Sequence, residues 1–329
     1  MEKLKVGVIG TGHLGKLHLK MFKQIENCEL VGIYDVNPEQ ADSAGTEYQT
    51  EVFNSPDSLL KLTQAVSIAA TTSQHYKLVK KALENNIHVF VEKPITSEII
   101  EAEELVKISN EKKLNLQVGH IERFNPALIS LEKYIVNPMF IQTDRLAQFN
   151  PRGTDVAVVL DLMIHDIDVI LNLVKSNVSR LDANGVAVVS DSIDIANARI
   201  QFENGAVANV TASRISQKKM RKMRIFQRDT YLSLDFITGV SEIYKLIPLE
   251  KNIDPSLITF GEIGIGEKRK KIVYEQPEIK EINALEYELQ LFVNSVLNKK
   301  RPVVSGEDGL KALKVAQLII ERIESQTVS

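Results

Sequence analysis

The first third of the chain alternates short apolar runs with longer amphipathic segments. The apolar runs are rich in β-branched residues and predict strands at Lys5–Ile9, Leu30–Tyr34, Ala65–Ala70, His88–Val91 and Asn115–Gly119. Strands that alternate with helices indicate βαβ units and therefore a parallel sheet. Several runs are apolar throughout, as expected for a sheet that is covered on both faces. We therefore expect a doubly wound α/β Rossmann domain over residues 1–121.

After residue 121 the pattern changes to longer strands in which apolar and polar residues alternate. These strands are predicted at Met139–Gln148, Val186–Val189, Ile193–Phe202, Ala206–Ser213, Arg221–Gln227 and Thr230–Asp235. Asn204-Gly205 is a strong hairpin signal between two of them. Consecutive strands joined by turns make an antiparallel sheet. Residues 122–329 are thus expected to form an α+β domain for substrate binding and oligomerisation, with an open, mainly antiparallel sheet and closing helices near Ile282–Leu297 and Gly306–Ile323.

Length and charge agree with a two-domain protein that binds a small molecule. The 329 residues exceed what one hydrophobic core usually organises. The formal net charge of −3 gives no overall field that would recruit nucleic acid or an anionic membrane. A run of basic residues from Arg214 to Arg228 is typical of a solvated strand edge, and a phosphate clamp is the alternative.

Cysteine content and hydropathy bear on the location of the protein. The single cysteine, Cys28, excludes an internal disulfide bond. The N-terminus lacks the pattern of a signal peptide, and no apolar run is long enough to span a bilayer. We therefore expect a cytoplasmic protein.

A glycine-rich segment directly follows the first predicted strand and opens an amphipathic stretch. It reads Gly10-Thr11-Gly12-His13-Leu14-Gly15. Between a strand and a helix, this pattern is typical of dinucleotide binding, because glycine allows close approach of a pyrophosphate to the N–H groups of a helix N-terminus. Asp35 ends the second strand, where a carboxylate can accept hydrogen bonds from ribose hydroxyls and would repel a 2′-phosphate. We expect NAD as the cofactor; the alternative is an ordinary glycine-rich turn with a solvated Asp35.

Glu92-Lys93-Pro94 ends the fourth predicted strand. This is the carboxyl edge of the sheet, where doubly wound folds bind ligands. Proline removes a backbone donor and fixes the turn, so Lys93 would be held at the strand tip. A solvated lysine at a strand end is the alternative. We assign both Glu92 and Lys93 to the cofactor site.

A second polar group lies in a helix predicted from about Val156 to Val174. At 100° per residue, the side chains of Asp161, His165, Asp168 and Asn172 form one narrow stripe. The rest of the helix is apolar, and such a helix is usually buried on most sides. The stripe is therefore expected to line a cavity, and a solvent-exposed face is the alternative.

These groups together predict hydride transfer from an alcohol. The reaction needs a partner that accepts the hydroxyl proton, and His165 suits this task near neutral pH. Asp161 could orient the ring or bind a substrate hydroxyl, while Lys93 would stabilise the developing alkoxide. Lys93 could instead be the base if burial and neighbouring charge lowered its pKa, and the sequence does not decide between the two. The remaining histidines lack metal-ligand spacing, so no metal is expected.

With Pro302-Val-Val-Ser-Gly-Glu-Asp-Gly309, these motifs resemble the glucose-fructose oxidoreductase, inositol dehydrogenase and rhizopine catabolism family, Gfo/Idh/MocA, over essentially the whole chain. The resemblance implies that Lys93, Asp161 and His165 serve catalysis and substrate binding. It also places Thr72 and His75 against the nicotinamide half of the cofactor. Thr71 stands where the family usually has proline, which makes this loop less rigid.

Two segments look particularly like one branch of that family. Gly119-His-Ile-Glu-Arg-Phe-Asn-Pro126 and Asp161-Leu-Met-Ile-His-Asp-Ile-Asp168 resemble enzymes that oxidise the 3-hydroxyl of UDP-N-acetylhexosamines. The resemblance implies a UDP-3-keto sugar product, with Arg123 and Asn125 binding substrate beside the cofactor. Arg145 and Arg152 are candidates for contacts with a substrate diphosphate, and each could equally be a surface arginine.

Other members of the family leave alternatives open. One is a polyol or inositol dehydrogenase, or an enzyme that passes hydride between two sugars. Another is a non-catalytic NAD-dependent sensor, which we would expect to have lost Lys93 or His165. An uncovered face of the antiparallel sheet would favour a homodimer or homotetramer.

Overall fold

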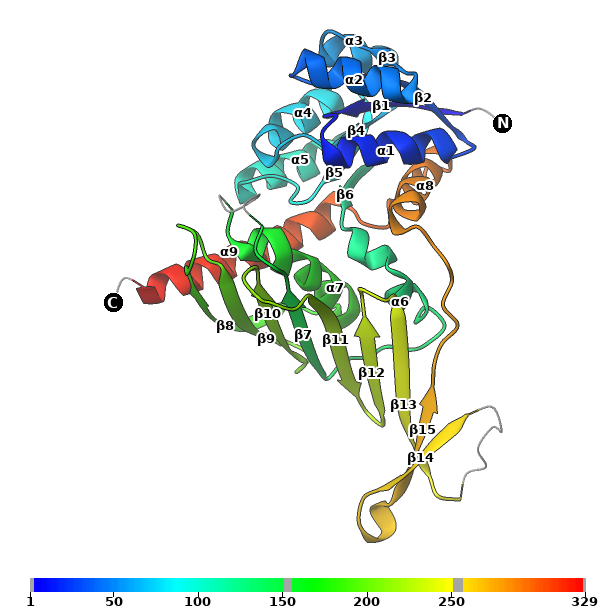
Figure 1. Cartoon of the computed structure of the whole chain (residues 1–329), viewed down its shortest axis with the longest axis vertical. Helices are drawn as coiled ribbons and strands as arrows, with labels where there is room; N and C mark the ends of the chain where they lie inside the picture. Colours follow the sequence, from blue (N-terminus) through cyan, green and yellow to red (C-terminus); the bar gives the residue numbers. More distant parts are fainter. Residues whose placement is uncertain (1–2, 151–155, 251–256, 328–329) are drawn as a thin grey trace. The chain divides into compact units, whose positions relative to one another are not determined.

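The computed structural model describes residues 3–150, 156–250 and 257–327, which fall into two compact units (Figure 1). Unit 1 comprises Met1–Ile121 and Asn283–Lys314, and unit 2 comprises Glu122–Ile282 and Val315–Ser329. Arg152, a candidate for a diphosphate contact, lies outside the described residues. Within the described ranges, no helix has the length and apolar character needed to cross a membrane.

Unit 1 is built on a parallel sheet with the strand order β3-β2-β1-β4-β5-β6 in the described residues. Its strands are β1 (Leu4–Ile9), β2 (Cys28–Tyr34), β3 (Glu51–Val52), β4 (Ala65–Ile68), β5 (His88–Glu92) and β6 (Leu116–Gly119). Its helices include α1 (His13–Gln24), α2 (Pro38–Tyr48), α3 (Pro56–Leu60), α4 (Thr72–Glu84), α5 (Ile99–Lys112) and α8 (Ala284–Leu297). The winding reverses between β1 and β4, which confirms the predicted doubly wound Rossmann sheet.

The core of unit 1 is completed by α8, which comes from the far end of the chain and lies beside α1 (Figure 1). Phe292 of α8 packs edge-on against Phe90 of β5, with ring centroids 5.8 Å apart. Leu289 and Val293 join the same buried cluster. The sequence assigned Ile282–Leu297 to the second domain. The structure instead groups this helix with unit 1. Each large apolar side chain that the helix buries in this core stabilises the packing by about 1.5–3 kcal/mol.

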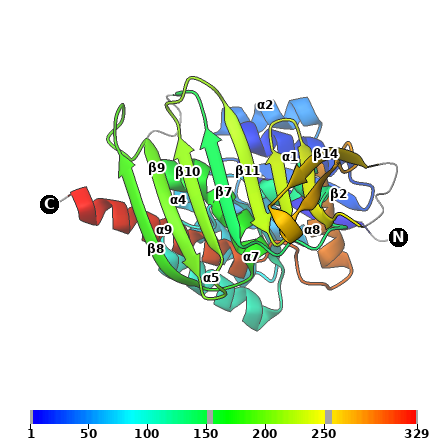
Figure 2. The ribbon, with the colours of Figure 1, turned by 90° about the horizontal axis from the view of Figure 1, so that it is seen from below.

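Unit 2 is built on one broad sheet, seen face-on with α7 behind it in Figure 2. The described strands follow the order β14-β15-β13-β12-β11-β7-β10-β9-β8. They are β7 (Phe140–Leu146), β8 (Val178–Val186), β9 (Ile195–Phe202), β10 (Val207–Ser213), β11 (Met220–Gln227), β12 (Thr230–Asp235), β13 (Val240–Pro248), β14 (Ile258–Ile263) and β15 (Lys270–Glu275). Neighbouring strands are antiparallel except β7 and β10, which are parallel, so the prediction of an open, mainly antiparallel sheet is confirmed.

Helical segments complete the described part of unit 2. They are η1 (Ile121–Phe124), α6 (Pro126–Ile129), the π-helical turn η2 (Val159–Met163), α7 (Ile164–Val174), η3 (Gly266–Lys268) and the later part of α9 (Gly306–Thr327). The helix α7 packs against β7 and β10. Side chains on β7 and β10 alternate between buried and half-buried, as expected for strands with one face covered.

The predicted strand Val186–Val189 is wrong beyond its first residue. The backbone N–H groups of Val188 and Val189 each donate to Asp194 Oδ2 at 2.8 Å. A backbone that turns around a carboxylate cannot also extend a ladder of strand hydrogen bonds, so this run is a loop. The strand in this part of the chain is β8 instead. Only Leu181 and Ala183 of this strand are buried and its polar residues outnumber them, so the alternation of apolar and polar residues was too weak to predict a strand.

The basic run from Arg214 to Arg228 does not form a strand edge. It contains β11, which pairs with β7 on one side and β12 on the other. Lys222 lies opposite Asp235 of β12, with an N–O distance of 3.6 Å. Arg224 pairs diagonally with Asp144 of β7, with an N–O distance of 3.4 Å. The positive charges are therefore partly balanced across the sheet.

Candidate functional site

The glycine-rich turn after β1 has the geometry required for close approach of a ligand. Gly10 has a φ of +92°, and a Cβ there would stand 2.7 Å from the backbone of Ala69. A Cβ on Gly15 would stand 1.9 Å from the Gly10 carbonyl oxygen. At Gly12, by contrast, no heavy atom of the described chain lies within 4 Å of the Cβ position. The fold of the turn therefore requires glycine at positions 10 and 15, where a Cβ would clash with the backbone. Gly12 instead leaves open space in front of α1.

The start of α1 is suited to bind an anion. Gly12 is the N-cap residue and has no side chain with which to satisfy the N–H groups of the first turn. His13 and Leu14, which begin the helix, are exposed. The unpaired N–H groups and the positive end of the helix dipole are the features that bind a pyrophosphate.

Asp35 follows β2 and is tied to the glycine turn. Its Oδ2 accepts hydrogen bonds from Thr11 N at 2.6 Å and Thr11 Oγ1 at 3.0 Å, and its Oδ1 accepts from Asn37 N at 2.8 Å. A carboxylate offers about four acceptor positions, so these bonds leave capacity on Oδ1 for a ribose hydroxyl. Asp35 therefore both fixes the turn and presents a negative charge that disfavours a 2′-phosphate.

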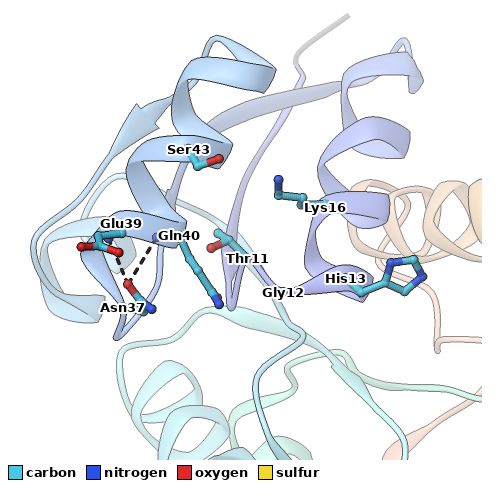
Figure 3. A pocket seen from close by; sticks show the side chains of 8 residues that line it. All are labelled: Thr11, Gly12, His13, Lys16, Asn37, Glu39, Gln40 and Ser43. Carbon is cyan, nitrogen blue, oxygen red and sulfur yellow. Dashed lines mark hydrogen bonds between the residues drawn. The ribbon is translucent and has the colours of Figure 1, made fainter. Parts of the chain in front are cut away.

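A cavity of about 460 Å³ lies between the glycine turn and the start of α2 (Figure 3). It is lined by Thr11, Gly12, His13, Lys16, Asn37, Glu39, Gln40 and Ser43. The cation in this lining, Lys16, pairs with Glu47 at 2.7 Å. Asn37 Oδ1 accepts from the N–H groups of Glu39 and Gln40 and so caps α2 (Figure 3). With Lys16 neutralised and Glu39 adding negative charge, the part of the cavity at the start of α2 suits ribose hydroxyls better than a 2′-phosphate.

Lys93 lies at the end of β5, on the same carboxyl edge of the sheet. The Lys93–Pro94 peptide bond is cis. His75 of α4 contacts this segment, because its Nδ1 lies 2.9 Å from Pro94 O, while its Nε2 lies 3.1 Å from Ala70 O. Burial lowers the pKa of His75, so the ring is neutral and donates one N–H. His75 is only 1% exposed, whereas Thr72, the first residue of α4, is half-buried.

Asp161 and His165 lie where the π-helical turn Val159–Met163 runs into α7. The sequence predicted a single α-helix over Val156–Val174, with 100° per residue. This spacing is wrong at Asp161, because hydrogen bonds from residue i to i+5 widen a π-helical turn. Asp161 and His165 remain partly exposed, whereas Asp168 is 1% exposed. The predicted stripe therefore divides into an accessible end and a buried end.

The buried end of the stripe is bound by Arg123. This arginine donates from Nε and Nη2 to the two carboxylate oxygens of Asp168 at 2.7 and 2.6 Å, and from Nη1 to Asn172 at 3.4 Å. Asn125, expected like Arg123 to bind substrate, caps α6 and donates from Nδ2 to Phe236 O at 3.0 Å. The sequence did not predict these contacts, since partners 45 and 111 positions apart leave no spacing signal.

Arg145 forms the second buried ion pair on α7. It donates to both carboxylate oxygens of Asp166 at 2.8 and 3.0 Å, and to Glu122 at 3.2 Å. Burial opposes the charge of Arg145, but Asp166 and Glu122 outweigh burial and raise its pKa. The suggested diphosphate contact of Arg145 is wrong, because the side chain is 3% exposed and bound within unit 2. The two arginines hold α7 through Asp166 and Asp168, which closely follow His165.

Comparisons with known proteins cover both units. Residues 4–120 match the oxidoreductase family with an NAD-binding Rossmann fold, and residues 140–230 match the GFO/IDH/MocA C-terminal domain. A UDP-N-acetylglucosamine 3-dehydrogenase of Acidithiobacillus ferrooxidans is 39% identical over 245 residues, which is 74% of this chain and 78% of the relative. A solved structure of UDP-N-acetylglucosamine 3-dehydrogenase from that organism has a TM-score of 0.88 at 33% identity, with 99% of both chains covered. A myo-inositol 2-dehydrogenase of Thermotoga maritima is 23% identical over 345 residues, covering 98% of this chain and 97% of the relative.

The matched ranges contain the glycine turn and Asp35 in unit 1, and α7 with the buried Arg145–Asp166 pair in unit 2. Within the described residues, no group of three or more histidine, cysteine, aspartate or glutamate side chains could hold a metal ion. The site geometry fits a dinucleotide at the glycine turn. The chain therefore belongs to the Gfo/Idh/MocA family of NAD-dependent oxidoreductases.

Proposed function

We propose that the protein oxidises the 3-hydroxyl of a UDP-N-acetylhexosamine to a ketone, with NAD as the hydride acceptor. The observation that carries this proposal is the similarity to the UDP-N-acetylglucosamine 3-dehydrogenase, which spans both units with a TM-score of 0.88 at 33% identity. The myo-inositol 2-dehydrogenase is less similar, at 23% identity. Identity over the second unit matters most, because in this proposal the second unit binds the sugar.

The proposed reaction removes a hydride from the sugar C3 and a proton from its 3-hydroxyl. NAD, when bound, supplies the hydride acceptor. His165 accepts the proton, since an imidazole is suited to this near neutral pH and α7 is held rigidly by two buried ion pairs. Asp161 orients the imidazole or binds a neighbouring hydroxyl. Lys93 donates a hydrogen bond to the oxygen as its negative charge develops.

The geometry of unit 1 supports the proposed cofactor contacts. The glycine turn, with Gly10, Thr11, Gly12, His13, Leu14 and Gly15, receives the pyrophosphate, and Asp35 receives the adenosine ribose. Thr72 and Lys93 contact the nicotinamide half directly. His75 and Glu92 support that half through the segment around Lys93, because both are held by hydrogen bonds inside unit 1. In unit 2, Arg123 and Asn125 support substrate binding from the segment before α6.

The first test follows NADH absorbance with purified protein, NAD and a panel of alcohols. The panel contains UDP-GlcNAc, UDP-GalNAc, the uronate of UDP-GlcNAc and myo-inositol. An aminotransferase with glutamate removes the keto sugar and so drives an unfavourable oxidation forward. Turnover of a UDP-amino sugar is the expected result. Turnover of myo-inositol alone would refute the proposed nucleotide-sugar substrate and would favour the alternative of a polyol dehydrogenase.

Variants separate an enzyme from a non-catalytic sensor. Lys93→Ala and His165→Ala should each lower kcat by about 100-fold or more, as expected for loss of proton transfer or of oxyanion stabilisation, while NAD still binds. His88→Ala, at the opposite end of β5 from Lys93, is the matched control and should keep turnover. NAD binding without turnover of any substrate in the panel would favour the sensor.

We also propose that the protein is a homodimer or homotetramer joined through the sheet of unit 2. Aromatic rings form a continuous row across neighbouring strands, with centroids 4.8–5.9 Å apart from Phe140 through Phe226, Tyr231 and Tyr244 to Tyr274. Phe226 is 40% exposed. Such a row of accessible rings is suited to a second sheet of the same kind. A cytoplasmic location stays a prediction.

A further inference from the structure

A buried polar cluster adjoins Lys93 in unit 1. His18 of α1 and Ser67 of β4 are both 0% exposed, and the Glu92 side chain is 13% exposed. His18 Nδ1 lies 2.7 Å from Ser67 Oγ, and His18 Nε2 lies 3.0 Å from Glu92 Oε1. The second carboxylate oxygen, Glu92 Oε2, accepts a hydrogen bond from Lys93 N at 3.3 Å. One carboxylate thus joins a buried histidine to the backbone of Lys93.

The chemistry of Glu92 determines which nitrogen of the ring carries a proton. Burial favours the neutral acid, but the hydrogen bond and charge of His18, followed by the charge of Lys93, outweigh it and lower the pKa of Glu92. Glu92 is therefore a carboxylate, which can only accept hydrogen bonds. His18 Nε2 must then carry the hydrogen and donate it. A buried carboxylate without such a donor would be strongly disfavoured.

The surrounding residues leave this pair little freedom. Phe90 packs edge-on against the His18 ring, with centroids 5.4 Å apart and an interplanar angle of 75°. A Cβ on Gly119 of β6 would stand 3.1 Å from Glu92 Oε2, so the carboxylate fills the space that glycine leaves. In the described residues, the titratable groups that interact electrostatically with Glu92 are His18 from α1, the adjacent Lys93 and His75 from α4. Ser67 and Gly119 add neutral neighbours from β4 and β6.

We propose that His18 and Glu92 are positioning residues for Lys93. The hydrogen bond from His18 keeps Glu92 ionised and aligned, and the charge of Glu92 stabilises the ammonium form of Lys93. This inference rests on the proposed role of Lys93 in the reaction. His18 and Glu92 are 74 positions apart, and the fold alone brings them together.

Matched variants separate the charge of Glu92 from its bulk. Glu92→Gln keeps the size of the side chain and removes the charge. His18→Phe keeps a ring against Phe90 but removes the donor, so the buried carboxylate should take up a proton and lose its charge. His18→Gln restores a donor close to the position of Nε2. His88→Gln, at the other end of β5, is the control for loss of a histidine from unit 1.

The direct readout is the NMR titration of Lys93 in protein labelled with ¹³C at lysine Cε. Its signal is assigned by its absence in Lys93→Arg. In Glu92→Gln and His18→Phe the titration of Lys93 should move to lower pH by about one unit, the effect of losing a nearby opposite charge. In His18→Gln and His88→Gln it should stay near that of the unchanged protein. If His18→Phe does not fold, Glu92→Gln and His18→Gln still decide the question.

The pH profile of kcat/KM is the second readout. The limb that reports Lys93 should move to lower pH in Glu92→Gln, whether Lys93 acts as a base on the acidic limb or as a cation on the alkaline limb. A folded Glu92→Gln protein with an unchanged Lys93 titration would overturn the inference, as would a His18→Gln protein that shifts as far as His18→Phe. Absence of turnover with every sugar in the panel would refute the proposed function but not this inference, because the NMR titration of Lys93 does not require turnover.

Discussion

Replacing Arg123 with methionine should loosen α7, the helix that carries His165. Asp168 is 1% exposed, and its two carboxylate oxygens accept the Nε and Nη2 hydrogen bonds of Arg123. Removing the arginine leaves a buried carboxylate without its counter-ion, which costs about 3–5 kcal/mol. That is a large share of the roughly 5–15 kcal/mol by which a folded protein is stable.

Amide hydrogen exchange over Ile164–Val174 measures this loss locally, which matters because the chain has two units that need not unfold together. Each 1.4 kcal/mol is a factor of ten in an opening equilibrium. A cost of 3–5 kcal/mol therefore predicts exchange that is faster by about 140- to 3,700-fold in Arg123→Met. Turnover should fall in parallel, because His165 is no longer held in place.

Two further variants test the reasoning. Arg123→Met combined with Asp168→Leu removes both charges, and exchange should return to within about tenfold of the unchanged protein. Arg180→Met is the surface control, because Arg180 and Asp182 form an exposed pair that contributes little. Normal exchange in Arg123→Met, or a double variant as labile as the single one, would refute the argument.

Other features of the structure lead to predictions that can be checked directly. Gly12→Ala should keep the thermal midpoint but weaken NAD binding by about tenfold in calorimetry, since only the ligand occupies that space. Gly15→Ala should instead lower the stability of the protein by about 1–3 kcal/mol or more in circular-dichroism melts, because its Cβ would overlap the Gly10 carbonyl. Burial raises the pKa of Cys28 to about 12, so a disulfide reagent at pH 8 should modify it only after unfolding in urea. Because the thiol ionises more readily in the unfolded chain, its contribution to stability is present below about pH 8.5 and is lost as the pH rises towards 12. Phe226→Asp should dissociate the proposed oligomer in light scattering without lowering NAD affinity.

The results that would contradict these predictions are equally specific. Unchanged NAD affinity in Gly12→Ala would mean that the pyrophosphate does not approach this turn. Rapid labelling of Cys28 in the folded protein would show that β2 opens readily. An unchanged mass for Phe226→Asp would remove the aromatic row from the oligomer interface.

The elements that could be predicted from the sequence are those with a local signal. The run before Gly10 is apolar, the turn is rich in glycine and the next segment is amphipathic, so strand, turn and helix follow from neighbouring residues alone. The first strand was predicted within one residue of β1 (Leu4–Ile9). Asp35 and Lys93 were placed at strand ends for the same reason.

The contacts that could not be predicted join distant positions. Arg123 with Asp168, and His18 with Glu92, are ordinary charged or polar residues until the fold brings them together. The π-helical turn at Asp161 could not be predicted, because its residues, mostly apolar, are of the kinds that also form an α-helix. β13 (Val240–Pro248) was missed although its first residues alternate, because the strand carries half-buried side chains over much of its length.

The packing of α8 in unit 1 has a consequence for how the protein is made. During synthesis, Phe90 emerges from the ribosome long before Phe292, its partner in the core. Residues 1–121 alone would expose the apolar surface that α8 covers, and would be prone to aggregate. A soluble NAD-binding fragment should therefore require residues 283–314, joined to the first segment by a short linker in place of unit 2.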